Sequence, residues 1–256
     1  MAGLDLGTLL ALGGVSLLAG FVDAVAGGGG MLVMPALLSI GMPPHLVLGT
    51  NKLISTFGTL TASLTFIRKG LFQPRRWAIT AVATFLGALA GAVLIYQFDA
   101  GVLKKLLPLV IVTVAVYSVW PRRRGRPSIT DNDHRPNAAA QTVAGTGIGF
   151  YDGFIGPGTG AFWTVAALRG FRQDLVRAAG VARFMNLMSN LAALLAFATL
   201  GAVDWLTGAT MGLALMGGAW IGAHSAIRFG ANLIRPVFIT VVLAMAGRLL
   251  YLEFVG

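Results

Sequence analysis

The sequence predicts an all-α polytopic membrane protein made of two inverted repeats with five segments each. The chain is 56% hydrophobic and only 11% charged, with a mean hydropathy of +0.80. Soluble domains carry roughly 25% charged residues. Long apolar segments recur along the chain, as expected for membrane spans. In addition, an aspartate followed by glycines occurs at matching positions in the two halves.

Five apolar segments are expected in each half. In the first half they cover roughly 6–26, 30–40, 46–67, 77–96 and 103–120, and in the second roughly 138–155, 159–169, 180–200, 207–227 and 234–252. A helix needs about 20 residues to cross a bilayer, and the second segment of each half is shorter. We therefore expect 30–40 and 159–169 to be half-helices that begin near the membrane midplane.

The two half-helices follow a repeated motif. Gly20–Gly30 reads GFVDAVAGGGG, and its counterpart Gly149–Gly158 reads GFYDGFIGPG. Consecutive glycines break a helix, and an aspartate inside a membrane needs a partner or a role. Broken, acid-bearing segments at matching positions in two halves point to the substrate site of a transporter. The alternative is that the glycines only allow close helix packing.

The repeat extends beyond this motif. Lys52 matches Arg183, and the GxxxG pair Gly87 and Gly91 matches Gly218 and Gly222, for which we expect a packing role. Because each half holds an odd number of segments, the second half must be inverted relative to the first. The predicted units are an N-terminal transmembrane repeat over 1–120, a cytoplasmic linker over 121–137 and a C-terminal transmembrane repeat over 138–256.

The charges set the orientation. Most basic residues fall in loops that the positive-inside rule places in the cytoplasm. They are Arg68, Lys69, Arg75, Arg76, Arg122, Arg123, Arg124, Arg126, Arg135, Arg169, Arg172, Arg177, Arg228 and Arg235. Both termini are then outside. The net charge of +10 reflects this bias, so the expected partner is the lipid bilayer and not nucleic acid.

The start of a half-helix offers free backbone N–H groups and a positive dipole end, to which glycine lets an anion come close. Two such starts facing one cavity would form an anion site with no metal or cofactor. The candidate substrate-binding residues are Gly27, Gly28, Gly29, Gly30, Asn51, Lys52, Gly156, Gly158, Thr159, Arg183 and Asn186. The chain has no cysteine and three scattered histidines, so we expect neither a metal site nor an enzyme.

Two roles are open for the intramembrane charges. Lys52 and Arg183 either attract the anion or neutralise Asp23 and Asp152 in ion pairs. Proximity within one half suggests that Lys52 pairs with Asp23. The aspartates in turn either carry coupling protons or serve only as ion-pair partners and helix caps.

These motifs resemble the TauE/SafE sulfite exporter family of bacterial membrane permeases. The first half carries DAVAGGGGMLVMPALLSIGMPP (Asp23–Pro44) and GTNKL (Gly49–Leu53); the second carries the weaker copies DGFIGPGTGAFW (Asp152–Trp163) and GVARFMN (Gly180–Asn186). The copies differ, so the two half-sites are not equivalent. The resemblance implies transport, usually outward, of sulfite or a small organosulfonate.

We therefore expect a secondary transporter of such an anion in a bacterial inner membrane, with a homo-oligomer as a further expectation. A passive anion channel and a cation carrier that uses Asp23 and Asp152 are the alternatives.

Overall fold

The computed structural model describes residues 6–99, 101–102, 137–234, 236–237 and 240. All regular structure within them is helical. The expected segment over 103–120, nearly all of the linker over 121–137 and most of the segment over 234–252 lie outside the described residues.

The long helices follow the expected segments closely. They are α1 (Leu6–Ala26), α3 (Pro44–Arg68), α4 (Ala78–Tyr96), α6 (Ala138–Phe154), α8 (Leu175–Thr199) and α9 (Trp205–Phe229). The main difference is the start of α8, five residues before the predicted 180. There the Asp174 side chain accepts hydrogen bonds from the backbone N–H groups of Val176 and Arg177, both at 3.0 Å, and so caps the helix earlier.

The predicted short helices are present. α2 (Gly30–Ser39) has ten residues, and α7 (Thr159–Val165) has seven and continues into a π-helical turn, η2 (Ala166–Gly170). A 3₁₀ turn, η1 (Pro74–Trp77), precedes α4. The short helices begin directly after the glycine motifs, as expected.

The glycines break the helices because their backbone takes a left-handed conformation. After α1 ends at Ala26, Gly27 has φ +85°, and after α6 ends at Phe154, Gly156 and Gly158 have φ +93° and +78°. Side chains are strained in this region, whereas glycine adopts it readily. The sequence therefore fixes where each helix stops.

Among the described residues, four helices are long and apolar enough to cross a membrane. They are Gly7–Ala26, Pro74–Tyr96, Leu175–Thr199 and Trp205–Phe229. Large apolar side chains also point outward, with Val143 74% and Leu206 77% exposed. This surface suits lipid and not water, so the expected all-α polytopic membrane class is confirmed.

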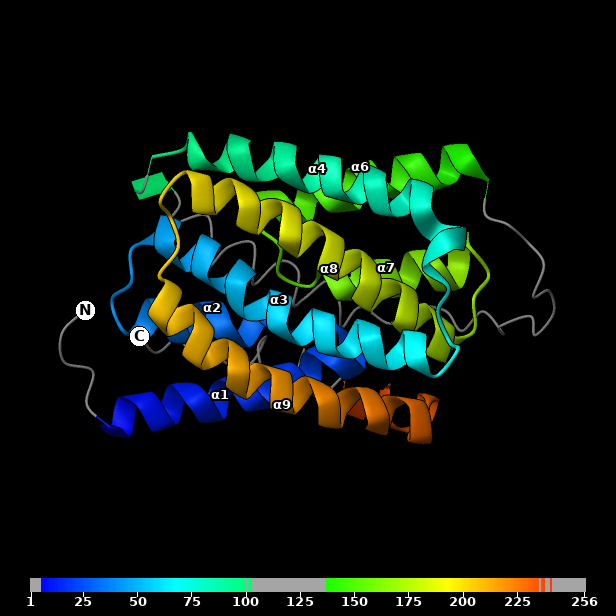
Figure 1. Cartoon of the computed structure of the whole chain (residues 1–256), viewed down its shortest axis with the longest axis horizontal. Helices are drawn as coiled ribbons and strands as arrows, with labels where there is room; N and C mark the ends of the chain where they lie inside the picture. Colours follow the sequence, from blue (N-terminus) through cyan, green and yellow to red (C-terminus); the bar gives the residue numbers. More distant parts are fainter. Residues whose placement is uncertain (1–5, 100, 103–136, 235, 238–239, 241–256) are drawn as a thin grey trace, which may run out of the picture.

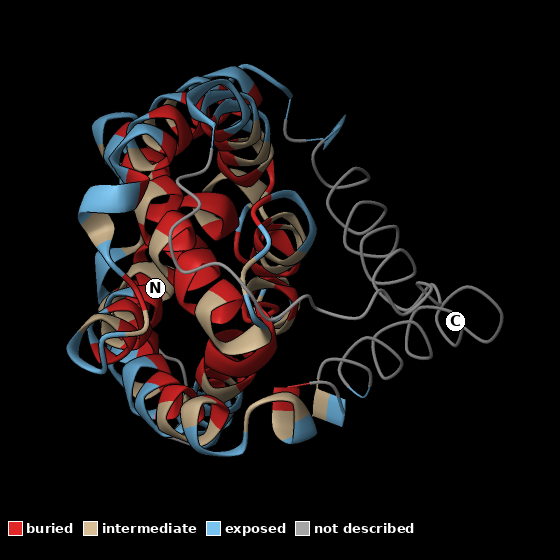
Figure 2. Ribbon diagram, turned by 90° about the vertical axis from the view of Figure 1, so that its right-hand side faces the viewer, coloured by how far each residue is buried: buried red, intermediate tan, exposed pale blue. Residues whose placement is uncertain are grey.

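The long helices run side by side along the longest axis of the molecule (Figure 1). α4 lies against α6 at one edge and α1 against α9 at the other, with α3 and α8 packed together between them. Figure 2 shows the buried residues inside this bundle and the exposed ones on its outer faces. The helix contacts are symmetric between the two halves. When α1 is exchanged with α6, α3 with α8 and α4 with α9, the contact of α4 with α6 becomes that of α9 with α1. In the same way, the contact of α3 with α9 becomes that of α8 with α4.

The two GxxxG pairs lie at the edge contacts. A Cβ added at Gly87 would lie 2.5 Å from the Thr146 carbonyl oxygen of α6, and one at Gly222 would lie 2.6 Å from the Phe21 carbonyl oxygen of α1. Cβ additions at Gly91 and Gly218 would meet backbone of the same two helices. The predicted packing role of these glycines is confirmed.

Candidate functional site

The two glycine breaks meet at a small cavity inside the bundle. Its free volume of about 20 Å³ is room for about one water molecule. The lining residues are Asp23, Gly27, Gly29, Gly30, Asn51, Lys52, Ser55, Asp152, Gly156, Gly158, Thr159, Gly160, Asn186 and Asn190. They come from α1, α2, α3, α6, α7, α8 and the breaks, so the cavity lies where the two halves of the chain meet.

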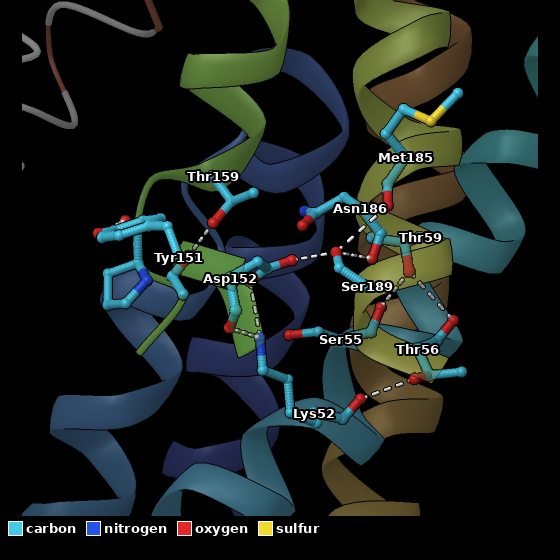
Figure 3. A network of polar contacts seen from close by, with 12 residues as sticks. Lys52, Ser55, Thr56, Thr59, Tyr151, Asp152, Thr159, Met185, Asn186 and Ser189 are labelled. Atoms are coloured by element: carbon cyan, nitrogen blue, oxygen red, sulfur yellow. Dashed lines mark hydrogen bonds and ion pairs between the residues drawn. The ribbon is translucent and has the colours of Figure 1, made fainter. Parts of the chain in front are cut away.

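Lys52 of α3 forms a tight ion pair with Asp152 of α6. The Lys52 Nζ atom lies 2.6 Å from Asp152 Oδ1 and 2.5 Å from the Asp152 carbonyl oxygen. The second carboxylate oxygen, Oδ2, accepts a hydrogen bond from the Ser189 hydroxyl of α8. Figure 3 shows Lys52 and Ser189 approaching Asp152 from different helices. Both charged side chains are buried, and each is well satisfied by polar partners.

Arg183 of α8 forms a looser pair with Asp23 of α1. The Arg183 Nη1 atom lies 3.6 Å from Asp23 Oδ2, beyond hydrogen-bond distance. The other carboxylate oxygen of Asp23 accepts the Gly29 backbone N–H at 3.0 Å, just ahead of α2. Arg183 is completely buried, and none of its three guanidinium nitrogens has a hydrogen-bond partner within the described structure. Buried donors of this kind are costly.

Both ion pairs cross between the halves. Lys52 of the first half pairs with Asp152 of the second, and Arg183 of the second half pairs with Asp23 of the first. The expected pairing of Lys52 with Asp23 is therefore wrong. Closeness in sequence misled because α3 and α8 pack together between the two edges, and each brings its cation to the aspartate of the opposite half.

Each cation also lies against the glycine break of the opposite half. A Cβ at Gly156 would lie 2.8 Å from Lys52 Nζ, and a Cβ at Gly27 would lie 2.6 Å from Arg183 Nη2. Gly160 contacts the same guanidinium, at 2.7 Å from its added Cβ. Gly27 and Gly156 are needed both for their backbone conformation and for the space that the cation occupies, and Gly160 is needed for the space alone.

Polar side chains complete the cavity wall. Asn51 Oδ1 and Asn190 Nδ2 are buried and have no hydrogen-bond partner in the described residues. The hydroxyl of Thr159 donates to the Gly156 carbonyl oxygen at 2.6 Å, so its proton is already engaged. The cavity thus holds an amide acceptor, an amide donor and an ammonium group within one small space.

The structure brings together most of the predicted site. Gly28 and Arg183 are the two predicted residues that do not line the cavity; Arg183 instead lies beside Gly27 and Gly160. The sequence reasoning missed Ser189. A signal for it was its position three residues after Asn186, which puts both on one face of α8.

The histidines show no shared site. The His45 ring lies tilted against the Tyr96 ring, and His224 contacts the carbonyl oxygen of Trp220; His134 lies outside the described residues. Within the part of the chain that the structure describes, no group of three metal-ligating side chains is found.

The sequence is similar to a known family of membrane proteins and to several probable membrane transporters. The family model of the sulfite exporter TauE/SafE matches residues 12–249. A probable membrane transporter protein of Haemophilus influenzae is 36% identical over 240 residues, which cover 93% of this chain and 92% of that protein. A probable membrane transporter protein of a Sinorhizobium species is 38% identical, over 91% of this chain and 88% of its own length.

A more distant relative carries the family name itself. The sulfite exporter TauE/SafE family protein 5 of Arabidopsis thaliana is 26% identical over 130 residues, which is 46% of this chain and 29% of that protein. No solved structure shows significant similarity to the chain. From the family match over nearly its whole length, the chain is a multi-pass membrane protein that belongs to the TauE/SafE sulfite exporter family.

Proposed function

We propose that the protein is a secondary transporter that exports sulfite or a small organosulfonate across a bacterial inner membrane. The anion binds near the membrane midplane, between two inverted repeats. One observation carries the proposal: the buried ammonium of Lys52 opens onto a cavity walled by the glycine breaks of both halves. The family name and the exchange pattern of helix neighbours support it.

The groups around the cavity suit an oxyanion. Lys52 supplies a positive charge, the Asn190 amide a free N–H donor, and the start of α2 the positive end of a helix dipole. The glycines beside them leave space for substrate oxygens close to the backbone. An organosulfonate or sulfite offers three oxygens to such donors.

The ion pairs argue against a cation carrier. Asp152 already accepts from Lys52 and Ser189, and Asp23 accepts from Gly29 and faces Arg183. A cation would have to displace a fixed positive charge from each carboxylate. The cavity volume of about 20 Å³ holds about one water molecule, so an oxyanion requires the cavity to widen. A site that must open to load favours a carrier over a permanently open channel.

Reconstituted flux tests this function. Purified protein in liposomes should show saturable uptake of labelled sulfite and counterflow against internal unlabelled anion. A channel gives voltage-driven flux without counterflow. Absence of both, with thermal shifts from neither sulfite nor sulfonates, would overturn the proposal.

The variant Gly30→Ala tests the location. Its added Cβ lies 3.5 Å from Asn51 Nδ2, an ordinary contact, so the fold tolerates it while the cavity shrinks. We expect anion affinity to fall roughly tenfold, from the loss of about one good polar contact. Gly13→Ala in α1, where nothing lies within 4 Å of the added Cβ, is the matched control. Equal affinities in the two variants would place the site elsewhere.

A further inference from the structure

We propose that Asp152 is a proton-binding site that loads together with the anion, so that transport is coupled to protons through this one carboxylate. The inference rests on the proposed function and adds the coupling ion and its location. It begins with the fact that Lys52 lines the cavity and that its ammonium is already engaged by Asp152.

An entering anion must compete with Asp152 for Lys52. Two Lys52 contacts go to Asp152, one to the carboxylate and one to the carbonyl oxygen. The cavity has room for about one water molecule, with a free volume of about 20 Å³. An anion that reaches the Lys52 Nζ atom therefore has to enter the space between the Lys52 ammonium and Asp152.

The charge balance then requires a proton. Once Lys52 neutralises the anion, Asp152 is a buried carboxylate without a counter-ion, which costs several kcal/mol. Protonation at one carboxylate oxygen removes this cost, and the Ser189 hydroxyl can turn from donor to acceptor for the new O–H group. The proton enters from the aqueous side that supplies the anion. It leaves on the other side, when Lys52 returns to Asp152.

Asp23 does not meet these conditions. Its partner Arg183 does not line the cavity, so an anion there competes less directly for the guanidinium. The Asp23 carboxylate is also held by the Gly29 backbone N–H, which does not depend on the cation. An arginine also stays charged whatever its surroundings.

The groups that face Asp152 are few. α3 contributes Lys52, and α8 contributes Ser189 and, further along, Arg183. Asp23 of α1 lines the same cavity, and the neighbouring Tyr151 hydroxyl is turned to the Pro157 carbonyl oxygen. α4 and α7, which also pack against α6, contain no Asp, Glu, Lys, Arg or His. Lys52 is thus the group whose movement decides the charge of Asp152.

The test measures the affinity of purified protein for ethanesulfonate, a monoanion whose charge is fixed between about pH 6 and about pH 8. Because the bound state holds one more proton than the free state, affinity should rise as the pH falls, by up to about tenfold per pH unit. Binding in weakly buffered solution should take up as much as one proton per anion. Asp152→Asn, which mimics the protonated carboxyl, should bind without pH dependence and without proton uptake. Asp99→Asn, which removes an exposed carboxylate outside the cavity, should keep both.

A second variant guards against a folding defect in Asp152→Asn. Ser189→Ala removes a donor to the charged carboxylate, so the pH dependence should shift to higher pH. Ser16→Ala, which removes a buried hydroxyl with no hydrogen-bond partner, is the control and should leave the curve in place. If wild-type protein binds with no pH dependence, or if Asp152→Asn keeps the dependence, the inference is overturned while the proposed function stands. If the wild type binds neither ethanesulfonate nor sulfite at any pH, the proposed function fails as well.

Discussion

The Lys52–Asp152 and Arg183–Asp23 pairs occupy matching places in the two halves, yet they are built differently. The lysine pair is short, has hydrogen bonds to both carboxylate oxygens of Asp152 and borders the cavity. The arginine pair is long, its guanidinium makes no hydrogen bond within the described part of the chain, and it lies beside Gly27 and Gly160. The two halves thus carry matching charges in different surroundings: the lysine pair borders the cavity, and the arginine pair lies beside Gly27 and Gly160.

Removing one partner of the tight pair should have the largest effect. Lys52→Ala leaves Asp152 buried without a counter-ion, and we expect a loss of about 3–5 kcal/mol of stability. Adding Asp152→Asn should recover most of it, whereas adding Asp23→Asn should not, because Asp23 is paired with Arg183. Melting temperature and folded yield in detergent give the answer. Recovery by Asp23→Asn instead would mean that the crossed pairing is wrong.

A smaller loss of stability is expected from substitutions at the glycine contacts, which are alike in the two halves. The aspartate-bearing helices α1 and α6 both rest on glycines, from α9 and α4 respectively. Gly218→Ala and Gly91→Ala should each cost about 1–3 kcal/mol, because the added methyl meets backbone that cannot turn aside. Gly217→Ala, with nothing within 4 Å of its added Cβ, is the control. If only one of the two variants lowers the melting temperature, the two edges do not depend on their glycines in the same way.

Replacing each cation by the other type, Lys52→Arg and Arg183→Lys, should have the smallest effect on stability. The two variants compare how closely each ion pair is fitted. Lys52→Arg brings a larger head group to a site where Gly156 already lies close to Nζ. Arg183→Lys keeps the charge and loses no hydrogen bond that the guanidinium makes within the described residues. We expect Lys52→Arg to be the more destabilising by about 1 kcal/mol. The reverse order in thermal melts would show that the arginine pair is the more closely fitted of the two.

The helices could be predicted largely from local chemistry. The glycine motifs fixed the ends of α1 and α6 and the starts of α2 and α7, because few other residues take up those backbone angles. The start of α8 was misjudged only because the capping role of Asp174 was not used. The π-helical turn at Ala166–Gly170 has no sequence signal that we can identify.

The sequence predicted most of the residues that form the site but not which of them pair with one another. The charged residues stood out because charges within apolar spans are rare. Which cation meets which aspartate depends on how α1, α3, α6 and α8 pack, and a single sequence carries no local signal of that packing. The place of Ser189 on the same face of α8 as Asn186 was a sequence signal, but its partner, the Asp152 carboxylate, comes from another helix.

The crossed pairing also bears on how the protein is made. Synthesis delivers α1 and α3, with Asp23 and Lys52, to the membrane before α6 and α8 bring Asp152 and Arg183. The early half therefore enters the lipid with its eventual partners still untranslated. An uncompensated charge in a bilayer is unfavourable. The first half is therefore least stable in the membrane before the second half has been synthesised. When α6 and α8 are inserted, Asp152 neutralises Lys52 and Arg183 neutralises Asp23.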